Sequence, residues 1–305
     1  PEFTYVSDIC PSKFDESVVF ASFNNIKRDD FLPYLLRSND KGNSWTSISG
    51  NLPKNGTVHS IEQDFINPDL LFAGTEFGIF FTTDGGKIWT QLKNGIPTIP
   101  VKDIAIQKRE HDLVLATFGR GFYILDNYSP LRELNSNVLE KESHLFPVKD
   151  ALLYIKSGGK YGQGDSYFKA PNPDFGAVFT YYLKDVPKTL NKIRKDKEKE
   201  LFKESKQIPQ PTDDELRLEK EEKDPHIVFT ITDDEGNVVR KLTKSAAKGI
   251  NRMVWDLNYH SVTPVVGTDK FKPTADPKSS TMILPGKYKV YISMISRDGI
   301  KNLDG

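Results

Sequence analysis

The first half of the sequence repeats with an offset of 43 to 44 residues, and this constrains the possible folds more than any other feature. Residues 38–45 read SNDKGNSW, and residues 82–89 read TTDGGKIW. Strand-like segments follow the two copies at matching positions: 58–61 and 101–104, 70–73 and 113–116, and 78–81 and 121–124. A partial earlier copy occupies residues 6–9, 18–21 and 34–37. Self-similarity at this period predicts a stack of similar structural units.

Each unit contains four short segments rich in β-branched and aromatic residues, separated by Gly, Asn, Asp or Pro. Four strands in a period of about 40–45 residues are typical of one blade of a β-propeller. A single blade cannot bury both of its faces, so neighbouring blades must stack. Fewer than three full copies cannot close a ring of about four to eight blades. We therefore expect residues 1–128 to be the final blades of a propeller whose upstream blades belong to a longer parent chain.

Both copies share the pattern [ST]-x-D-x-G-x-x-W, which comprises Ser38, Asp40, Gly42, Trp45 and Thr82, Asp84, Gly86, Trp89. This pattern resembles the Asp box of bacterial-neuraminidase-type repeats, found in sialidases, xyloglucanases and sortilin-like propellers. An aspartate accepts backbone N–H bonds across a tight turn, and glycine takes a positive φ at no steric cost. The tryptophan is expected to pack into the blade and fix the hairpin. We expect Asp40 and Asp84 to be structural rather than catalytic, because the family places these boxes at the blade periphery.

The repeat array ends at residues 119–126, which read GRGFYILD, and Asn127 occupies the place of a further Asp-box aspartate. A similar stretch ends the propeller in large exported proteins of the Bacteroidetes type, known as repeat-containing glycosyl hydrolases or sortilin-like proteins. This resemblance implies an exported protein, located in the periplasm, on the outer surface or outside a bacterium. Residues 129–174 then look like a connector that leaves the propeller.

The second half predicts a small antiparallel sandwich at residues 175–305. Strand-like segments occur at 175–183, 226–232, 238–242, 248–257 and 284–292, with turn residues between them. Their order resembles the immunoglobulin-like domain of flagellar hook-capping proteins and of C-terminal modules in exported bacterial enzymes. Residues 184–225 interrupt the sandwich with a charged insertion that predicts two helical pieces, the second starting at a capping box, Thr212 to Glu215. Mixed charge at helical spacing is typical of a solvated face, and partner binding is the alternative.

The composition excludes several classes of function. Lys+Arg and Asp+Glu both total 42, so the basic excess of a nucleic-acid-binding protein is missing. No apolar run approaches the 18–20 or so residues needed to span a bilayer. The single cysteine, Cys10, excludes an intrachain disulfide and a zinc site built from cysteines. The five histidines include no pair at i, i+4 spacing, so a zincin-type helix site is not expected. We expect neither a metal nor a cofactor.

Two residues are candidates for a functional site. Glu76 follows a strand that would border the central face of the propeller, where it is either a functional carboxylate or a turn residue. Arg120 is a candidate for binding an anionic ligand, with a salt bridge or a cap on the last blade as the alternative. Asp64 and Asp103 also lie near strand ends and are further candidates for the carboxylates of a glycoside hydrolase.

The whole pattern favours an all-β chain, with a partial Asp-box β-propeller followed by an immunoglobulin-like β-sandwich carrying a charged helical insertion. We expect a binding or scaffold module that recognises a protein, peptide or glycan. The alternative is a glycoside hydrolase, similar to sialidases or xyloglucanases, whose active site is completed by upstream blades. The sequence leaves the ligand, the blade number and any catalysis open.

Overall fold

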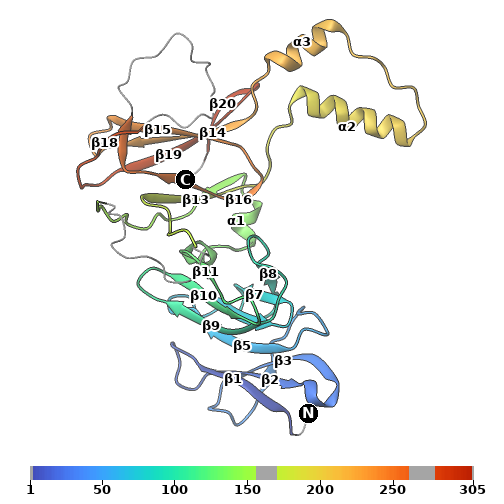
Figure 1. Ribbon diagram of the computed structural model, residues 1–305, viewed down its shortest axis with the longest axis vertical. Coiled ribbons are helices and arrows are strands. Elements are labelled where there is room, and N and C mark those ends of the chain that lie inside the picture. The colour runs from blue at the N-terminus through green and yellow to red at the C-terminus, as the bar shows by residue number, and fades with distance from the viewer. Residues whose placement is uncertain (1–2, 156–169, 261–278, 304–305) are drawn as a thin grey trace, which may run out of the picture. The chain divides into compact units, whose positions relative to one another are not determined.

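The computed structural model describes residues 3–155, 170–260 and 279–303 (Figure 1). The chain divides into two compact units, Pro1–Asn135 and Ser136–Gly305. Both are built mainly from small antiparallel sheets. Within the described ranges, no helix has the length and apolar character needed to cross a membrane.

The first unit contains three sheets, each made of strands that are consecutive in the sequence. The first sheet is β1 (Tyr5–Pro11), β2 (Val19–Asn25), β3 (Asp30–Ser38) and β4 (Thr46–Ser47); the second is β5 (Val58–Gln63), β6 (Leu71–Thr75), β7 (Gly78–Thr82) and β8 (Thr90–Gln91); the third is β9 (Val101–Gln107), β10 (Asp112–Thr117) and β11 (Phe122–Leu125). Each repeat of the sequence therefore forms one sheet, and the partial earlier copy forms a complete four-stranded one. Short 3-10 helices occur at Ile26–Arg28 (η1) and Ser129–Arg132 (η2).

Two hydrophobic cores lie between these sheets. The core between the first and second sheets includes Phe20, Leu35, Ile61 and Trp89. The core between the second and third sheets is built from the opposite face of the second sheet and from the third sheet, and includes Phe72, Ile79, Leu115 and Tyr128. Because the second sheet is covered on both faces, its strands β6 and β7 are buried throughout. Burial of each Leu, Ile or Phe side chain of these strands stabilises the fold by about 1.5–3 kcal/mol.

The first strand of each sheet lies against the first strand of the next, so that β5 contacts both β1 and β9. Each of these strands contains a register shift near its start. The extra residues, which have no partner on the second strand, are Ser7, His59 and Lys102. A β-bulge of this kind redirects the side chain of the extra residue and occurs often beside functional sites.

The second unit contains two antiparallel sheets that share one hydrophobic core. They are β12 (Ser143–Leu145), β13 (Ala177–Leu183) and β16 (Gly249–Trp255), and β14 (His226–Thr232), β15 (Val238–Ser245), β19 (Lys289–Ser296) and β20 (Gly299–Leu303). Phe179 of β13 stacks on Phe229 of β14 with ring centroids 5.7 Å apart, and Trp255 is buried in the same core. This unit also contains a helix α1 (Ser136–Glu140) and a two-stranded sheet, β17 (Asn258–His260) with β18 (Ser279–Met282). The segment expected as a connector thus contributes β12 to a sheet.

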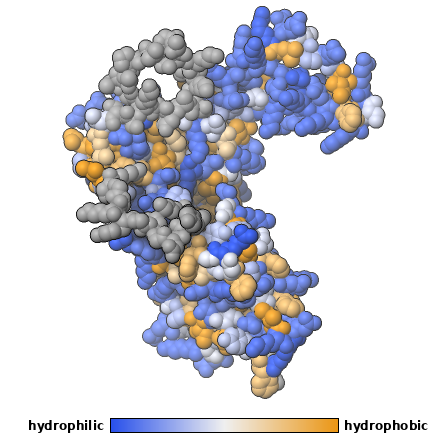
Figure 2. All heavy atoms as spheres, in the orientation of Figure 1, coloured by the Kyte–Doolittle hydropathy of each residue, from blue (hydrophilic) through white to orange (hydrophobic). Residues whose placement is uncertain are grey.

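Two helices, α2 (Leu190–Lys203) and α3 (Asp213–Glu221), separate β13 from β14 and form a hairpin. Thr189 caps α2, and Thr212 with Glu215 forms the capping box predicted from the sequence. Arg194 of α2 joins the helices through a two-pronged ion pair with Glu219, at 2.6 and 2.9 Å. Neither helix has a buried residue. The space-filling view shows the hairpin surface as mostly hydrophilic (Figure 2).

Candidate functional site

The bulged residues of two successive sheets meet. His59 of β5 and Lys102 of β9 occupy equivalent positions, 43 residues apart, and His59 Nε2 lies 2.9 Å from Lys102 Nζ. Glu76, in the turn between β6 and β7, brings its carboxylate Oε2 to 2.8 Å from the same His59 nitrogen and 3.5 Å from Lys102 Nζ. A carboxylate, an imidazole and an ammonium group therefore form one cluster.

The turn that holds Glu76 has a local cause in the sequence. Gly78 has φ +106°, a value that side-chain-bearing residues rarely adopt. The Thr75 hydroxyl donates to the Gly78 carbonyl and accepts from the Phe77 N–H, which closes the turn. The Glu76 N–H donates to the Thr57 carbonyl, so the residue is tied to the segment that precedes β5.

The charges of the cluster follow from its partners. Burial raises the pKa of Glu76, but the hydrogen bond with His59 and the charge of Lys102 outweigh burial and hold the pKa below its usual value. Burial lowers the pKa of His59, and the charge of Lys102 lowers it further, against the opposing effect of Glu76. At neutral pH the cluster therefore consists of a carboxylate, a neutral imidazole and an ammonium group. The His59 Nε2 atom donates to Glu76 in one tautomer and accepts from Lys102 in the other.

One exposed aromatic ring lies beside these polar groups, and a second exposed aromatic residue follows Glu76 in the sequence. Phe77 directly follows Glu76 and is exposed. Phe118, in the equivalent turn between β10 and β11, is exposed as well, and Lys102 Nζ lies 5.9 Å from its ring centroid. Arg120 is exposed two residues further on, and no hydrogen bond or ion pair of its side chain occurs within the described chain. The site thus offers hydrogen-bonding groups of both signs next to flat apolar surfaces.

The arrangement limits the chemistry open to Glu76. An ionised carboxylate serves as a nucleophile or base, whereas a general acid needs a raised pKa. Glycoside hydrolysis requires a second carboxyl group about 5–10 Å away. Among the contacts of the described residues, Glu76 is paired only with His59 and Lys102. The Asp103 carboxylate hydrogen-bonds the backbone N–H of Ile104.

The Asp-box residues form local turns between the third and fourth strands. Asp84 accepts hydrogen bonds from the Thr82 hydroxyl and from the backbone N–H groups of Lys87 and Ile88. Asp40 accepts from Ser38 and Ser44, and the hydrogen bonds from Ser44 lower its pKa to about 2.

The tryptophans of the two boxes differ. Trp89 is 3% exposed and donates from Nε1 to the carbonyl of Ile48 in the neighbouring sheet. Trp45 is 38% exposed and donates to Gly42 within its own turn. Only Trp89 therefore joins two sheets, whereas the sequence predicted the same packing for both.

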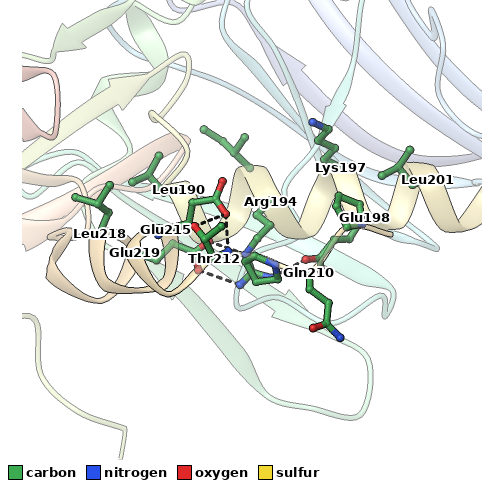
Figure 3. A pocket seen from close by; sticks show the side chains of 13 residues that line it. Leu190, Arg194, Lys197, Glu198, Leu201, Gln210, Thr212, Glu215, Leu218 and Glu219 are labelled. Atoms are coloured by element: carbon green, nitrogen blue, oxygen red, sulfur yellow. Dashed lines mark hydrogen bonds and ion pairs between the residues drawn. The ribbon is translucent and has the colours of Figure 1, made fainter. Parts of the chain in front are cut away.

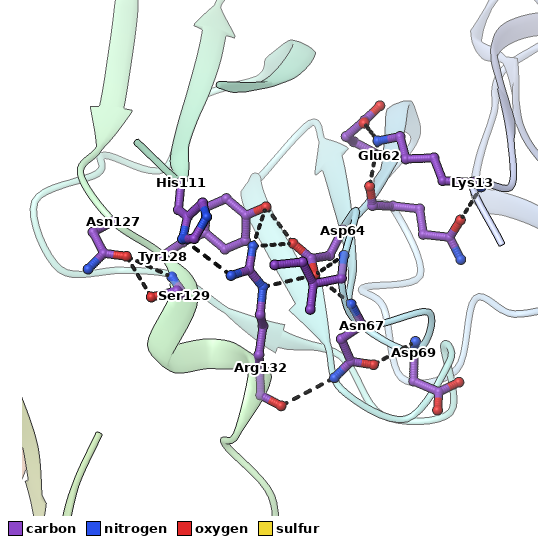
Figure 4. A network of polar contacts seen from close by, with 12 residues as sticks. Lys13, Glu62, Asp64, Asn67, Asp69, His111, Asn127, Tyr128, Ser129 and Arg132 are labelled. Atoms are coloured by element: carbon purple, nitrogen blue, oxygen red, sulfur yellow. Dashed lines mark hydrogen bonds and ion pairs between the residues drawn. The ribbon is translucent and has the colours of Figure 1, made fainter. Parts of the chain in front are cut away.

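Asp64 belongs to a different network, which the sequence did not predict (Figure 4). Its fully buried carboxylate accepts two hydrogen bonds from Arg132, one from the Tyr128 hydroxyl and two from backbone N–H groups. Burial raises the pKa of Asp64, but these hydrogen bonds outweigh burial and keep the carboxylate ionised. Every oxygen of the carboxylate is occupied, so Asp64 is a structural group.

The sequence analysis named Glu76 but did not find His59 or Lys102. Both residues stand at the same position of the repeat, directly after a buried valine, Val58 or Val101. The sequence does contain a signal for these two residues, because a polar side chain occupies the same position of the repeat in both copies. Within the described residues, no group of His, Cys, Asp and Glu side chains has the arrangement of a metal site.

No family model matches this chain, and no curated protein matches it. Among solved structures, the chain is similar to the GH74 xyloglucanase from Xanthomonas campestris, with 14% identity over 34% of this chain and 17% of that chain and a TM-score of 0.27. It is also similar to the extracellular domain of a one-component system from B. thetaiotaomicron, with 15% identity, 97% and 30% coverage and a TM-score of 0.30. A third similar structure is YCF48 bound to D1 peptide, with 15% identity, 60% and 52% coverage and a TM-score of 0.28. The chain spans between 17% and 52% of the length of these three proteins.

Proposed function

We propose that this chain is a recognition module of an exported protein, and that it binds a glycan, peptide or protein ligand at the cluster of His59, Glu76 and Lys102. In this proposal the first unit is the last part of an Asp-box β-propeller and the second is an immunoglobulin-like domain. The observation that carries the proposal is the direct contact between the bulged residues of two successive sheets, at 2.9 Å, beside an ionised carboxylate. A β-bulge redirects the side chain of its extra residue, and bulges occur often beside functional sites.

The chemistry of the cluster favours a ligand with both hydroxyl or amide groups and an apolar face. Glu76 accepts hydrogen bonds, Lys102 donates them, and both are about two-fifths exposed. Phe77 and Phe118 supply exposed rings on which a sugar or an aromatic side chain can stack. Arg120, two residues after Phe118 in the sequence, carries an exposed guanidinium, which suits a carboxylate on the ligand.

The test is a binding screen with the full chain, using a glycan array and a peptide library, followed by titration calorimetry with the ligands found. We expect the substitutions Glu76→Gln and Lys102→Gln each to weaken binding about tenfold or more, because each removes a charge-assisted hydrogen bond. The matched controls are Glu16→Gln and Lys41→Gln, which alter an exposed ion pair elsewhere in the first unit. Equal affinities for all four variants would place the ligand elsewhere and contradict the proposal.

A glycoside hydrolase is the second proposed function, and the ionised, partly exposed carboxylate of Glu76 favours it. The recognition module comes first because Glu76 is paired with His59 and Lys102, and its lowered pKa does not suit it to act as a general acid. Turnover of oligosaccharides by the full chain, lost in Glu76→Gln while binding persists, would establish the hydrolase. Binding without turnover would support the recognition module.

A further inference from the structure

Helix α2 carries a row of four lysines on one face. Lys192, Lys195, Lys199 and Lys203 follow one another at spacings of three or four residues, and all four are exposed. Side chains at this spacing lie on one side of a helix, here over a length of about 16 Å. We call these four residues the α2 lysine row.

The α2 lysine row lies opposite the face that points to α3. Leu190, Arg194 and Leu201 line the hollow between the two helices, together with Leu218 of α3 (Figure 3). By helical geometry these α2 residues lie about half a turn from the lysines. The α2 lysine row therefore lies on the side of α2 that faces away from α3.

The lysines of the row are free to bind an external partner, whereas the acidic residues nearby are largely occupied. Asp196 pairs with Lys188 at 2.7 Å, and Glu198 pairs with Arg194 at 2.6 Å. Within the described ranges, none of the four lysines makes a side-chain hydrogen bond or ion pair. Four exposed lysines without a direct ion pair are thus presented to the surroundings, and the nearby carboxylates of Asp196 and Glu219 offset part of their charge.

An apolar side chain accompanies the row. Phe202 is 75% exposed, and it lies seven residues after Lys195 and three after Lys199, on the flank of the same face. An exposed phenyl ring beside a row of lysines suits an interface in which anionic head groups border hydrocarbon, because the ring can enter the apolar layer. A partner that offered only negative charges would provide no apolar surface for the ring of Phe202 to contact.

We infer that the α2 lysine row with Phe202 is a docking surface for an anionic lipid bilayer. Four lysines along one side of a single helix can contact a flat surface together, and the hollow on the other side of α2 is not involved. Each lysine near such a surface raises the binding constant about fivefold. This surface lies in the second unit and is independent of the proposed ligand site in the first.

The experiment measures sedimentation of the full chain with vesicles of phosphatidylcholine, with and without one third phosphatidylglycerol. We expect binding to the anionic vesicles alone, and its loss when salt shortens the Debye length from about 10 Å at 0.1 M to about 3 Å at 1 M. Lys195→Gln with Lys199→Gln should weaken binding about 30-fold. Phe202→Ala should weaken it about tenfold, through lost apolar burial.

The matched control removes two lysines of the same hairpin that lie outside the row, Lys197→Gln with Lys220→Gln. Glutamine keeps the helix propensity close to that of lysine, and circular dichroism verifies that α2 persists. Unchanged binding of this control, with loss in the row variant, would support the inference. Equal loss in both double variants, binding to neutral vesicles, or no binding at all would overturn it. Loss in the row variant with no effect of Phe202→Ala, together with competition by soluble polyglutamate, would also overturn it in favour of an acidic polymer.

Discussion

Arg132 and Asp64 form a two-pronged ion pair, with Nε to Oδ2 and Nη2 to Oδ1 both at 2.9 Å, across 68 residues of sequence. The guanidinium also lies over the rings of Phe65 and Tyr128, at 4.9 and 5.2 Å from their centroids. Because Arg132 belongs to η2 and Asp64 directly follows β5, the pair fastens the end of the first unit to its middle sheet (Figure 4).

Breaking this pair should destabilise the first unit strongly. Asp64→Ala leaves the guanidinium of Arg132 and the hydroxyl of Tyr128 without their acceptor, at an expected cost of about 3–5 kcal/mol in the free energy of unfolding. Urea denaturation followed by circular dichroism measures the loss. The control is Glu16→Ala, which breaks the exposed pair with Lys41 and should cost at most about 1 kcal/mol. Similar losses in the two variants would show that the buried pair contributes no more than a surface one.

His59 predicts a pH dependence of stability. Its pKa is lowered in the folded chain by burial and by Lys102, whereas an unfolded histidine titrates near 6.5. As the pH falls below about 6.5, the unfolded chain therefore binds more protons at this residue than the folded chain does. The free energy of unfolding should decrease over this range, and the decrease should end once the folded pKa is passed.

The measurement compares urea midpoints of the wild type and His59→Gln between about pH 7.5 and 5. The other histidines titrate in both proteins, so only the difference between the two curves reports on His59. We expect the wild type to lose more stability on acidification than the variant. If the stability of the two proteins changed with pH in parallel, His59 would have the same pKa in the folded and the unfolded chain.

The repeat allowed the three sheets to be predicted, because strand composition, turn residues and period are local properties of the sequence. The contact between His59 and Lys102 could not be predicted, since it depends on register shifts and on how neighbouring sheets stack. Arg132 illustrates the same limit. Residues 129–134 carry ordinary connector signals, yet η2 remains within the first unit because its side chains meet a buried carboxylate that is remote in sequence.

The two Asp-box tryptophans should differ in their effect on stability. Trp89→Ala removes a buried ring that packs between two sheets and leaves the carbonyl of Ile48 without its donor, so we expect a loss of about 3–5 kcal/mol. Trp45→Ala removes a partly exposed ring that contacts its own turn and Phe23 of the same sheet, for which about 1 kcal/mol is expected. Denaturation midpoints of the two variants test this order. Equal losses would indicate that the turn, rather than the packing between sheets, determines the role of the tryptophan.

Two buried tyrosines provide a matched pair of substitutions with opposite expected signs. The hydroxyl of Tyr181 has no hydrogen-bond partner within the described residues, and burial raises its pKa to about 12. Tyr181→Phe removes an unsatisfied polar group from the core of the second unit and should leave stability unchanged or increase it by about 1 kcal/mol. Tyr128→Phe instead deletes a hydrogen bond of 2.5 Å to a buried carboxylate, and should cost about 1.5–3 kcal/mol. Thermal unfolding of both variants measures these two effects. A clear destabilisation by Tyr181→Phe would mean that the Tyr181 hydroxyl is hydrogen-bonded in solution, to water or to a part of the chain outside the described residues.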